Sequence, residues 1–319
     1  MVIERARVRA VQKPWGSSDL LPWSTLRLNT GPIGELWYER EQDSAAHPSL
    51  LLKLVATTEP LSIQVHPDDA FAQKMGLPSG KTEAWYILSA KPDSKVAVGL
   101  TRQISRQQLR QAIGDGSIAE LVQWRRVTEG DAVFVPAGTI HAIGAGLVIT
   151  EIQQRSDATF RMFDYGRPRE MHVDNAVSVA DAGPAKLRDE AKRYSDSRAI
   201  LVVDAHFVLE CIDLRPNSRW SLRAGRESWL LAVSGNAQIG PLDISIADAV
   251  YAEAEQVPIL VGTDGLKALV AYPGPTFDPG RLTELSVTGA DSVGHPSDVS
   301  PRQASTTTPV IKLTPEPPQ

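Results

Sequence analysis

The segment from Gly130 to His141 has the residue types of a strand, a tight turn and a metal-binding side chain. The apolar run Ala132–Val135 predicts a strand, while Pro136 and Gly138 supply the fixed and the permissive φ of a turn. His141 then begins a second strand, where a small β-barrel would hold a metal ligand. A single histidine on an apolar strand is equally compatible with a core residue, so partners elsewhere in the chain decide the question.

Suitable partners occur on two further predicted strands. On the first, alternation places Gln64 and His66 on one face, and on the second Lys81 and Glu83 point the same way. Zinc binds imidazole nitrogen and carboxylate oxygen at about 2.0 to 2.2 Å, and two histidines, one glutamate and a weak fourth ligand leave room for a substrate. The side chains that fit this inventory are Gln64, His66, Glu83 and His141.

The turn and histidine resemble the second metal motif of the cupin superfamily, although Ala145 stands where an asparagine usually closes that motif. With its other motifs, the chain resembles the short bacterial form of the type I mannose-6-phosphate isomerases. The resemblance spans at least residues 14 to 175, and its separate motifs occur in the right order. The segments that carry it are Pro14–Gly16, Pro32–Glu35, Leu61–Asp69, Gly80–Leu88, Val135–His141 and Glu151–Arg161.

The resemblance implies a zinc-dependent aldose-ketose isomerase that interconverts D-mannose 6-phosphate and D-fructose 6-phosphate through a cis-enediol. One Zn²⁺ per chain would be held by Gln64, His66, Glu83 and His141. The catalytic residues would be Glu151, Arg161, Lys81 and Asp157, and the substrate-binding residues Ser62, Lys81 and Arg161. Such a reaction needs a base over C1 and C2 and an electrophile near the developing oxyanion, and zinc suits the second task as a Lewis acid.

Each of these side chains also has a purely structural interpretation. Glu151 could be an exposed glutamate at a strand end, Asp157 could cap a turn, and Lys81 could be solvated at a strand start. Ser62 could satisfy a backbone group. Arg161 suits an anionic substrate because its guanidinium offers forked donors and stays charged. Which of Glu151, Lys81 or Asp157 moves the proton stays open.

Two other functions fit the same residues. An iron-dependent cupin oxygenase also uses two histidines and one carboxylate, and a non-catalytic sugar-phosphate-binding cupin would keep the pocket without turnover. Gln64 as a neutral ligand, with Lys81 and Arg161 nearby, favours a redox-inert metal and an anionic sugar. The sequence departs from the long members of the family at Gly80, where those tend to carry histidine, and it lacks their large helical insertion.

The elements that must position these residues suggest a mainly β fold with a few helices. We expect two cupin-like (jelly-roll) β-barrels in tandem, with only the first carrying a metal site. Glu227-Ser-Trp229 echoes Glu83-Ala-Trp85, but Pro258 takes the place of His141 in this faint repeat. The expected divisions are a catalytic barrel at 1–175 with short helical insertions at about 68–75 and 105–122, a connection at 176–200, a second barrel at 201–274 and a disordered tail at 275–319.

Composition limits the classes of partner. With 33 basic and 38 acidic residues, the formal net charge is −5 and no basic block is present, so we expect no nucleic acid. The lone Cys211 cannot form an intrachain disulfide, and no apolar run is long enough for a signal peptide or a membrane span. We therefore expect a cytoplasmic protein, a monomer or weak homodimer without membrane contact, whose partner is a small hexose 6-phosphate.

Overall fold

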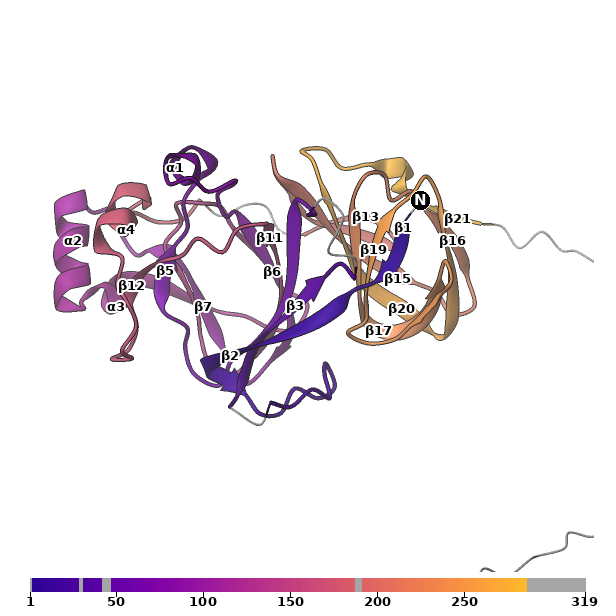
Figure 1. Ribbon diagram of the computed structural model, residues 1–319, viewed down its shortest axis with the longest axis horizontal. Coiled ribbons are helices and arrows are strands. Elements are labelled where there is room, and N and C mark those ends of the chain that lie inside the picture. The colour runs from indigo at the N-terminus through magenta and orange to yellow at the C-terminus, as the bar shows by residue number, and fades with distance from the viewer. Residues whose placement is uncertain (1, 29–30, 42–46, 187–190, 286–319) are drawn as a thin grey trace, which may run out of the picture. The chain divides into compact units, whose positions relative to one another are not determined.

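The computed structural model describes residues 2–28, 31–41, 47–186 and 191–285, and most of its regular structure is β-strand (Figure 1). The predicted mainly β fold with a few helices is confirmed. None of the helices in these ranges combines the length and apolar character needed to cross a membrane. The helices are α1 (Asp69–Lys74), α2 (Arg106–Asp115), α3 (Ile118–Leu121), α4 (Val173–Val179) and the 3₁₀-helix η1 (Pro279–Arg281).

The strands form three sheets, which are largely antiparallel. The six-stranded sheet contains, in spatial order, β2 (Arg7–Ser17), β3 (Ile33–Glu39), β4 (Leu50–Ala56), β11 (Leu147–Gln154), β6 (Glu83–Ala90) and β9 (Ala132–Val135). The five-stranded sheet contains β12 (Phe160–Phe163), β5 (Ile63–Val65), β10 (His141–Ile143), β7 (Lys95–Leu100) and β8 (Val122–Arg126).

The third sheet has ten strands and is built mainly from the carboxy-terminal part of the described chain. Its main path is β1 (Val2–Arg5), β19 (Ala249–Glu253), β17 (Ser228–Ile239), β20 (Val257–Pro273), β15 (Phe207–Leu214), β14 (Arg198–Val203) and β13 (Lys192–Ser195). The remaining strands are β16 (Arg219–Leu222) on β20, β21 (Leu282–Glu284) on β16, and β18 (Leu242–Ile244) on β17.

The six-stranded sheet buries both of its faces. Along β4, alternation sends Leu52 and Leu54 into a core that also contains Phe207 and Trp229 of the ten-stranded sheet. Val55, on the opposite face, joins a second core with apolar residues of the five-stranded sheet. Lys53, which stands between Leu52 and Leu54, therefore points toward the space between the six- and five-stranded sheets.

The helices cover the outer face of the five-stranded sheet. Ile63 and Val65 of β5 pack with Leu109 of α2 and Val177 of α4 in one apolar core. Because side chains alternate along a strand, Gln64 faces the opposite way, toward the space between the five- and six-stranded sheets. The helical layer thus supports β5, which carries Gln64 and leads directly into His66.

Helices α1, α2 and α3 lie within the ranges 68–75 and 105–122, where short helical insertions were predicted. Asp68 accepts a hydrogen bond from the Phe71 amide at the start of α1, and Ser105 forms a capping box with Gln108 at the start of α2. Helix α4 was not predicted. It begins after His172 without a side-chain cap, so the usual sequence signal for a helix start is missing there.

The predicted division into two barrels and a connection stays a prediction. Residues Met1–Ser286 cluster into one compact unit, and β1 pairs with β19 far along the chain. The predicted connection at 176–200 contains the end of α4 and all of β13.

The prediction of a disordered tail from residue 275 was wrong for the first part of that segment. Residues 275–285 contain η1 and β21, and β21 pairs with β16. Arg281 donates to the carbonyl oxygens of Arg223 and Ala224, and Leu282 is buried in the core of the ten-stranded sheet. The polar composition of this segment gave no indication of these contacts. The remainder of the predicted tail lies outside the described residues.

Candidate metal centre and active site

Three buried side chains converge on one point: Glu83 of the six-stranded sheet, His141 of the five-stranded sheet, and His66, which directly follows β5. His66 Nε2 lies 3.4 Å from Glu83 Oε2, and His141 Nε2 lies 3.5 Å from Glu83 Oε1. Potential ligand atoms of the three residues all lie within 4.8 Å of one another, and the two imidazole ring centroids are 4.7 Å apart. In the described ranges this is the one group of three or more such side chains that could hold a metal ion.

The predicted turn positions one of these side chains. His141 is the first residue of β10 and lies opposite Gln64 of β5 in the strand register. Gly138 adopts a φ of 86°, and its amide donates to the His66 carbonyl oxygen at 2.9 Å. The turn is therefore tied to the segment that carries the other histidine, which holds both imidazoles on the same side of the sheet.

The hydrogen bonds of the two imidazoles fit a metal ion. His66 Nδ1 donates to the Ala158 carbonyl at 2.8 Å, and His141 Nδ1 donates to the Thr139 carbonyl at 2.9 Å. Because a carbonyl oxygen only accepts, the proton must sit on Nδ1, and Nε2 of each ring presents its lone pair toward Glu83. Burial and the Lys81 ammonium lower the pKa of His66 to about 4, and burial lowers the pKa of His141. Neutral imidazoles oriented by carbonyl groups are the usual state of metal ligands.

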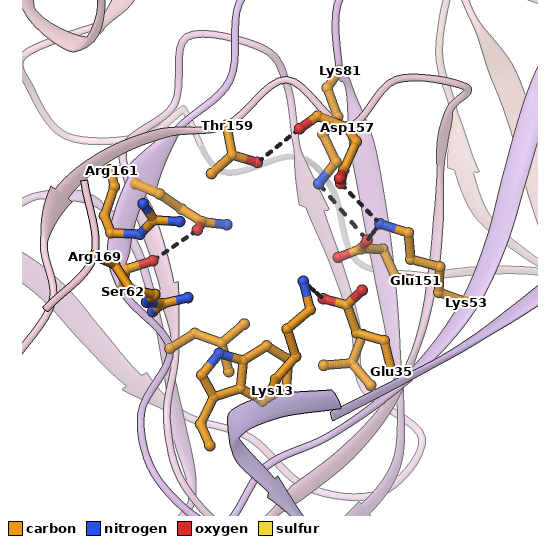
Figure 2. Close-up of a pocket in the computed structure, with 14 residues that line it drawn as sticks. Lys13, Glu35, Lys53, Ser62, Lys81, Glu151, Asp157, Thr159, Arg161 and Arg169 are labelled. Atoms are coloured by element: carbon orange, nitrogen blue, oxygen red, sulfur yellow. Dashed lines mark hydrogen bonds and ion pairs between the residues drawn. The ribbon is translucent and has the colours of Figure 1, made fainter. Parts of the chain in front are cut away.

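Gln64 and Ser62 lie beside this group. The Gln64 amide nitrogen is 3.2 Å from His141 Nε2, and the Ser62 hydroxyl donates to the Gln64 amide oxygen at 3.0 Å. Both residues line the pocket shown in Figure 2. The structure thus brings the four predicted metal ligands together, while their role as ligands stays a prediction.

Lys81 connects the ligand group to the pocket. Its ammonium forms an ion pair with Glu83, lies 3.0 Å from His66 Nε2 and lies 3.7 Å from Glu151 Oε1. Burial alone would lower the pKa of Lys81, but Glu151 and Glu83 raise it above its usual value. Lys81 is therefore a buried, charged ammonium, and not the solvated strand-start lysine considered from the sequence.

Glu151 lies between two ammonium groups. Lys53 Nζ is 3.3 Å from Glu151 Oε1 on one side, and Lys81 approaches the same oxygen on the other (Figure 2). Asp157 is 66 % exposed in its side chain, and its carboxylate lies 3.7 Å from Lys53 Nζ. Glu151 is therefore a buried carboxylate facing the pocket and not an exposed strand end, whereas Asp157 stands at the pocket rim.

Arg161 faces the opposite side of the same pocket. Its backbone pairs with Gln64 across β12 and β5, and its Nη1 donates to the Glu170 carbonyl at 2.6 Å. Burial and the neighbouring Arg169 lower the pKa of Arg161. The complete pocket lining is Lys13, Trp15, Glu35, Lys53, Val55, Leu61, Ser62, Gln64, Lys81, Glu151, Asp157, Thr159, Arg161 and Arg169.

Known proteins with a similar sequence are mannose-6-phosphate isomerases. The chain is 37% identical to the enzyme of Streptococcus mutans over 163 residues, which cover 48% of this chain and 51% of that protein. It is also 37% identical to mannose-6-phosphate isomerase ManA of Bacillus subtilis over 139 residues, or 41% of this chain and 44% of the relative. The chain thus spans about half the length of the curated relatives it matches. No protein-family model matches it.

Solved structures extend the comparison to most of the chain. The crystal structure of the mannose 6-phosphate isomerase from Bacillus subtilis has a TM-score of 0.74 at 22% identity, covering 84% of this chain and 98% of that one. The chain has the mannose-6-phosphate isomerase fold. A variant of phosphomannose isomerase from Salmonella typhimurium gives a TM-score of 0.69 at 15% identity, covering 86% and 100% of the two chains. The resemblance noted in the sequence is confirmed.

Within this isomerase fold, the pocket contains charged residues that sequence reasoning missed. Glu35 accepts hydrogen bonds from Lys13 at 3.1 Å and from the Trp37 indole at 2.7 Å. Lys53, 2 % exposed, also stacks over the Trp37 ring at 4.3 Å. The sequence did contain one indication that Lys53 is buried, because it stands alone among six apolar neighbours in Leu50–Ala56. A lysine in such a run requires a buried carboxylate partner.

Proposed function

We propose that the protein is an aldose-ketose isomerase that interconverts D-mannose 6-phosphate and D-fructose 6-phosphate. The observation that carries this proposal is the convergence of His66, Glu83 and His141 within 4.8 Å, beside a pocket whose walls hold both carboxylates and cations. The isomerase fold and the names of the sequence relatives give further support. A neutral sugar would not need so many cations.

We propose Zn²⁺ as the metal, held by Gln64, His66, Glu83 and His141. When bound, zinc would act as a Lewis acid that orients the substrate oxygens and stabilises negative charge on them. The donor set agrees with this choice because two imidazoles, one carboxylate and a neutral amide suit zinc and leave room for substrate.

The remaining side chains would move the proton and hold the sugar. Glu151 would carry the proton between C1 and C2 through a cis-enediol, because its carboxylate is buried and faces the pocket. The Lys81 and Lys53 ammonium groups on either side would keep that carboxylate in place. Asp157 at the rim would contact sugar hydroxyls. Ser62 and Arg161, on the opposite wall, would bind the phosphate end.

The iron oxygenase considered from the sequence would use the same ligands, so metal dependence is the sharpest test. The purified protein is stripped with a chelator, and mannose 6-phosphate conversion is followed by a coupled assay after adding zinc or ferrous iron. We expect turnover to vanish on chelation and to return with zinc without oxygen uptake. Oxygen consumption with iron, or no turnover with any metal, would refute the isomerase. The cytoplasmic location and the monomer or weak homodimer remain predictions.

A further inference from the structure

A buried carboxylate beside the pocket has no part in the proposed chemistry. Asp164 follows β12 directly and is 4 % exposed. Its Oδ2 accepts from Arg169 Nε at 2.5 Å, and its Oδ1 accepts from Arg169 Nη2 at 2.5 Å. This is a forked, two-point ion pair, the geometry that fixes a guanidinium most firmly.

The backbone after Asp164 is shaped to make this contact. Tyr165 and Gly166 adopt φ angles of 53° and 80°, so the chain reverses and brings two arginines back to the carboxylate. Arg167 Nη2 lies 2.9 Å from Asp164 Oδ1 and also donates to the Pro60 carbonyl at 2.7 Å. The turn is thereby fastened to the segment that leads into Ser62.

Arg169 reaches the pocket next to the proposed anion-binding residues. Figure 2 shows Arg161, Arg169 and Ser62 together on one wall, opposite Glu151 and Lys53. Arg169 commits Nε and Nη2 to Asp164, while Nη1 makes no hydrogen bond with the described residues. The Arg161 Nε is buried and also lacks a hydrogen-bond partner in the described part of the chain. Guanidinium donors without partners on one wall indicate an anionic ligand.

We propose that Asp164 is a positioning residue that holds Arg169 in place, so that Arg169 joins Arg161 and Ser62 in binding the phosphate end of the substrate. This inference rests on the proposed function and adds a source of selectivity to it. A guanidinium that is already fixed loses little conformational freedom when a dianion binds, so affinity is gained for phosphorylated sugars over neutral ones.

The test compares Asp164→Asn, Arg169→Ala and the double variant in the zinc-loaded protein. We expect Asp164→Asn to raise the KM for mannose 6-phosphate by about tenfold while kcat changes by less than about threefold, because the lost contact is to a charged group far from C1 and C2. The inhibition constant of inorganic phosphate should rise by a similar factor. In the Arg169→Ala background, Asp164→Asn should add nothing further, since it acts through Arg169.

Asp174→Asn is the matched control, because Asp174 also pairs with an arginine but is exposed and lies outside the pocket. If Asp164→Asn fails to fold, Arg169→Lys replaces it, and a rise in KM with weaker phosphate inhibition would support the inference. A KM and a phosphate affinity within twofold of the parent, or an additive effect in the double variant, would overturn it. Calorimetric titration with inorganic phosphate separates the two proposals. If the parent protein binds phosphate but shows no turnover, and Asp164→Asn no longer binds phosphate, the isomerase proposal is rejected and the inference is kept.

Discussion

At the scale of single residues, the pocket depends on a buried carboxylate flanked by two ammonium groups. Replacing Glu151 by Gln keeps the shape of the side chain but removes the proposed base, so we expect kcat to fall by at least about 100-fold. Metal content, measured by elemental analysis, should stay at the parent level because Glu151 is not a predicted ligand. Glu129→Gln, at an exposed position, serves as the control. Turnover within tenfold of the parent would assign the proton transfer to another group.

Lys53 gives a second prediction. Its ammonium pairs with Glu151 and stacks over Trp37, so Lys53→Met leaves a buried carboxylate with one cation fewer. We expect activity to fall by about tenfold or more, because Glu151 loses one of the two cations that hold it. The free energy of unfolding should also fall by about 3–5 kcal/mol, because removing one member of a buried ion pair leaves an uncompensated charge. The coupled assay and a thermal unfolding curve measure both consequences. Lys91→Met, on the surface, should change neither. An active, fully stable Lys53→Met variant would contradict the assignment.

Sequence patterns located the residues that lie on a recognisable motif. Strand alternation and the turn before His141 placed the four predicted ligands, and all four lie together. Glu35 and Arg169 carried no such signal, because each reaches the pocket through contacts between segments distant in sequence. Ion pairs of this kind depend on the folded register of several strands, which periodicity alone does not give.

At the scale of elements, the turn before β10 positions His141 in the candidate metal centre. Gly138 has a φ of 86°, and an added Cβ would approach the Val179 carbonyl oxygen at 3.2 Å. Gly138→Ala should therefore destabilise the fold by about 1–3 kcal/mol and lower zinc occupancy, since it displaces His141. Gly130→Ala is matched, with a φ of 91° and open space around it, and should cost stability without losing zinc. Equal zinc loss in both variants would rule out this role for the turn.

Helices and strands could be predicted where the local sequence contains a recognisable helix or strand pattern. The acidic residues after Pro67 predicted α1, the apolar spacing from Ser105 to Ile113 predicted α2, and the apolar run Ala132–Val135 predicted β9. Helix α4 lacks a cap, and β21 is three residues long and polar at two of them, so only packing makes them regular. Tertiary contacts decide such short elements, and a single sequence does not contain those contacts in readable form.

At the scale of the whole molecule, the equivalent glutamates in the two halves of the repeat, Glu83 and Glu227, have different roles. Trp85 donates to Glu83 at 3.1 Å and Trp229 donates to Glu227 at 3.2 Å, so the local geometry is kept. Glu83 faces the two histidines of the candidate metal centre, whereas Glu227 accepts from the Ser49 amide and hydroxyl at 2.7 Å each and from the Leu50 amide at 3.0 Å. Glu227 thus joins β17 to the start of β4.

This contact and the core shared between the six- and ten-stranded sheets predict cooperative unfolding. Glu227→Ala should lower the free energy of unfolding by about 2–4 kcal/mol, because the two donors of Ser49 and the buried Leu50 amide lose a charged acceptor. Denaturant titration followed by tryptophan fluorescence should give a single transition in both proteins, with Glu255→Ala, at an exposed position, unchanged. Two separated transitions in the parent would mean that the halves fold independently.

The pairing of β1 with β19 also fixes an order of events during synthesis. Val2–Arg5 is synthesised well before its hydrogen-bonding partner Ala249–Glu253, which lies far along the chain. Until then the nascent strand keeps an unsatisfied edge, which can attract chaperones or other nascent chains. Shortened versions that stop before residue 249 inherit the same unpaired edge permanently.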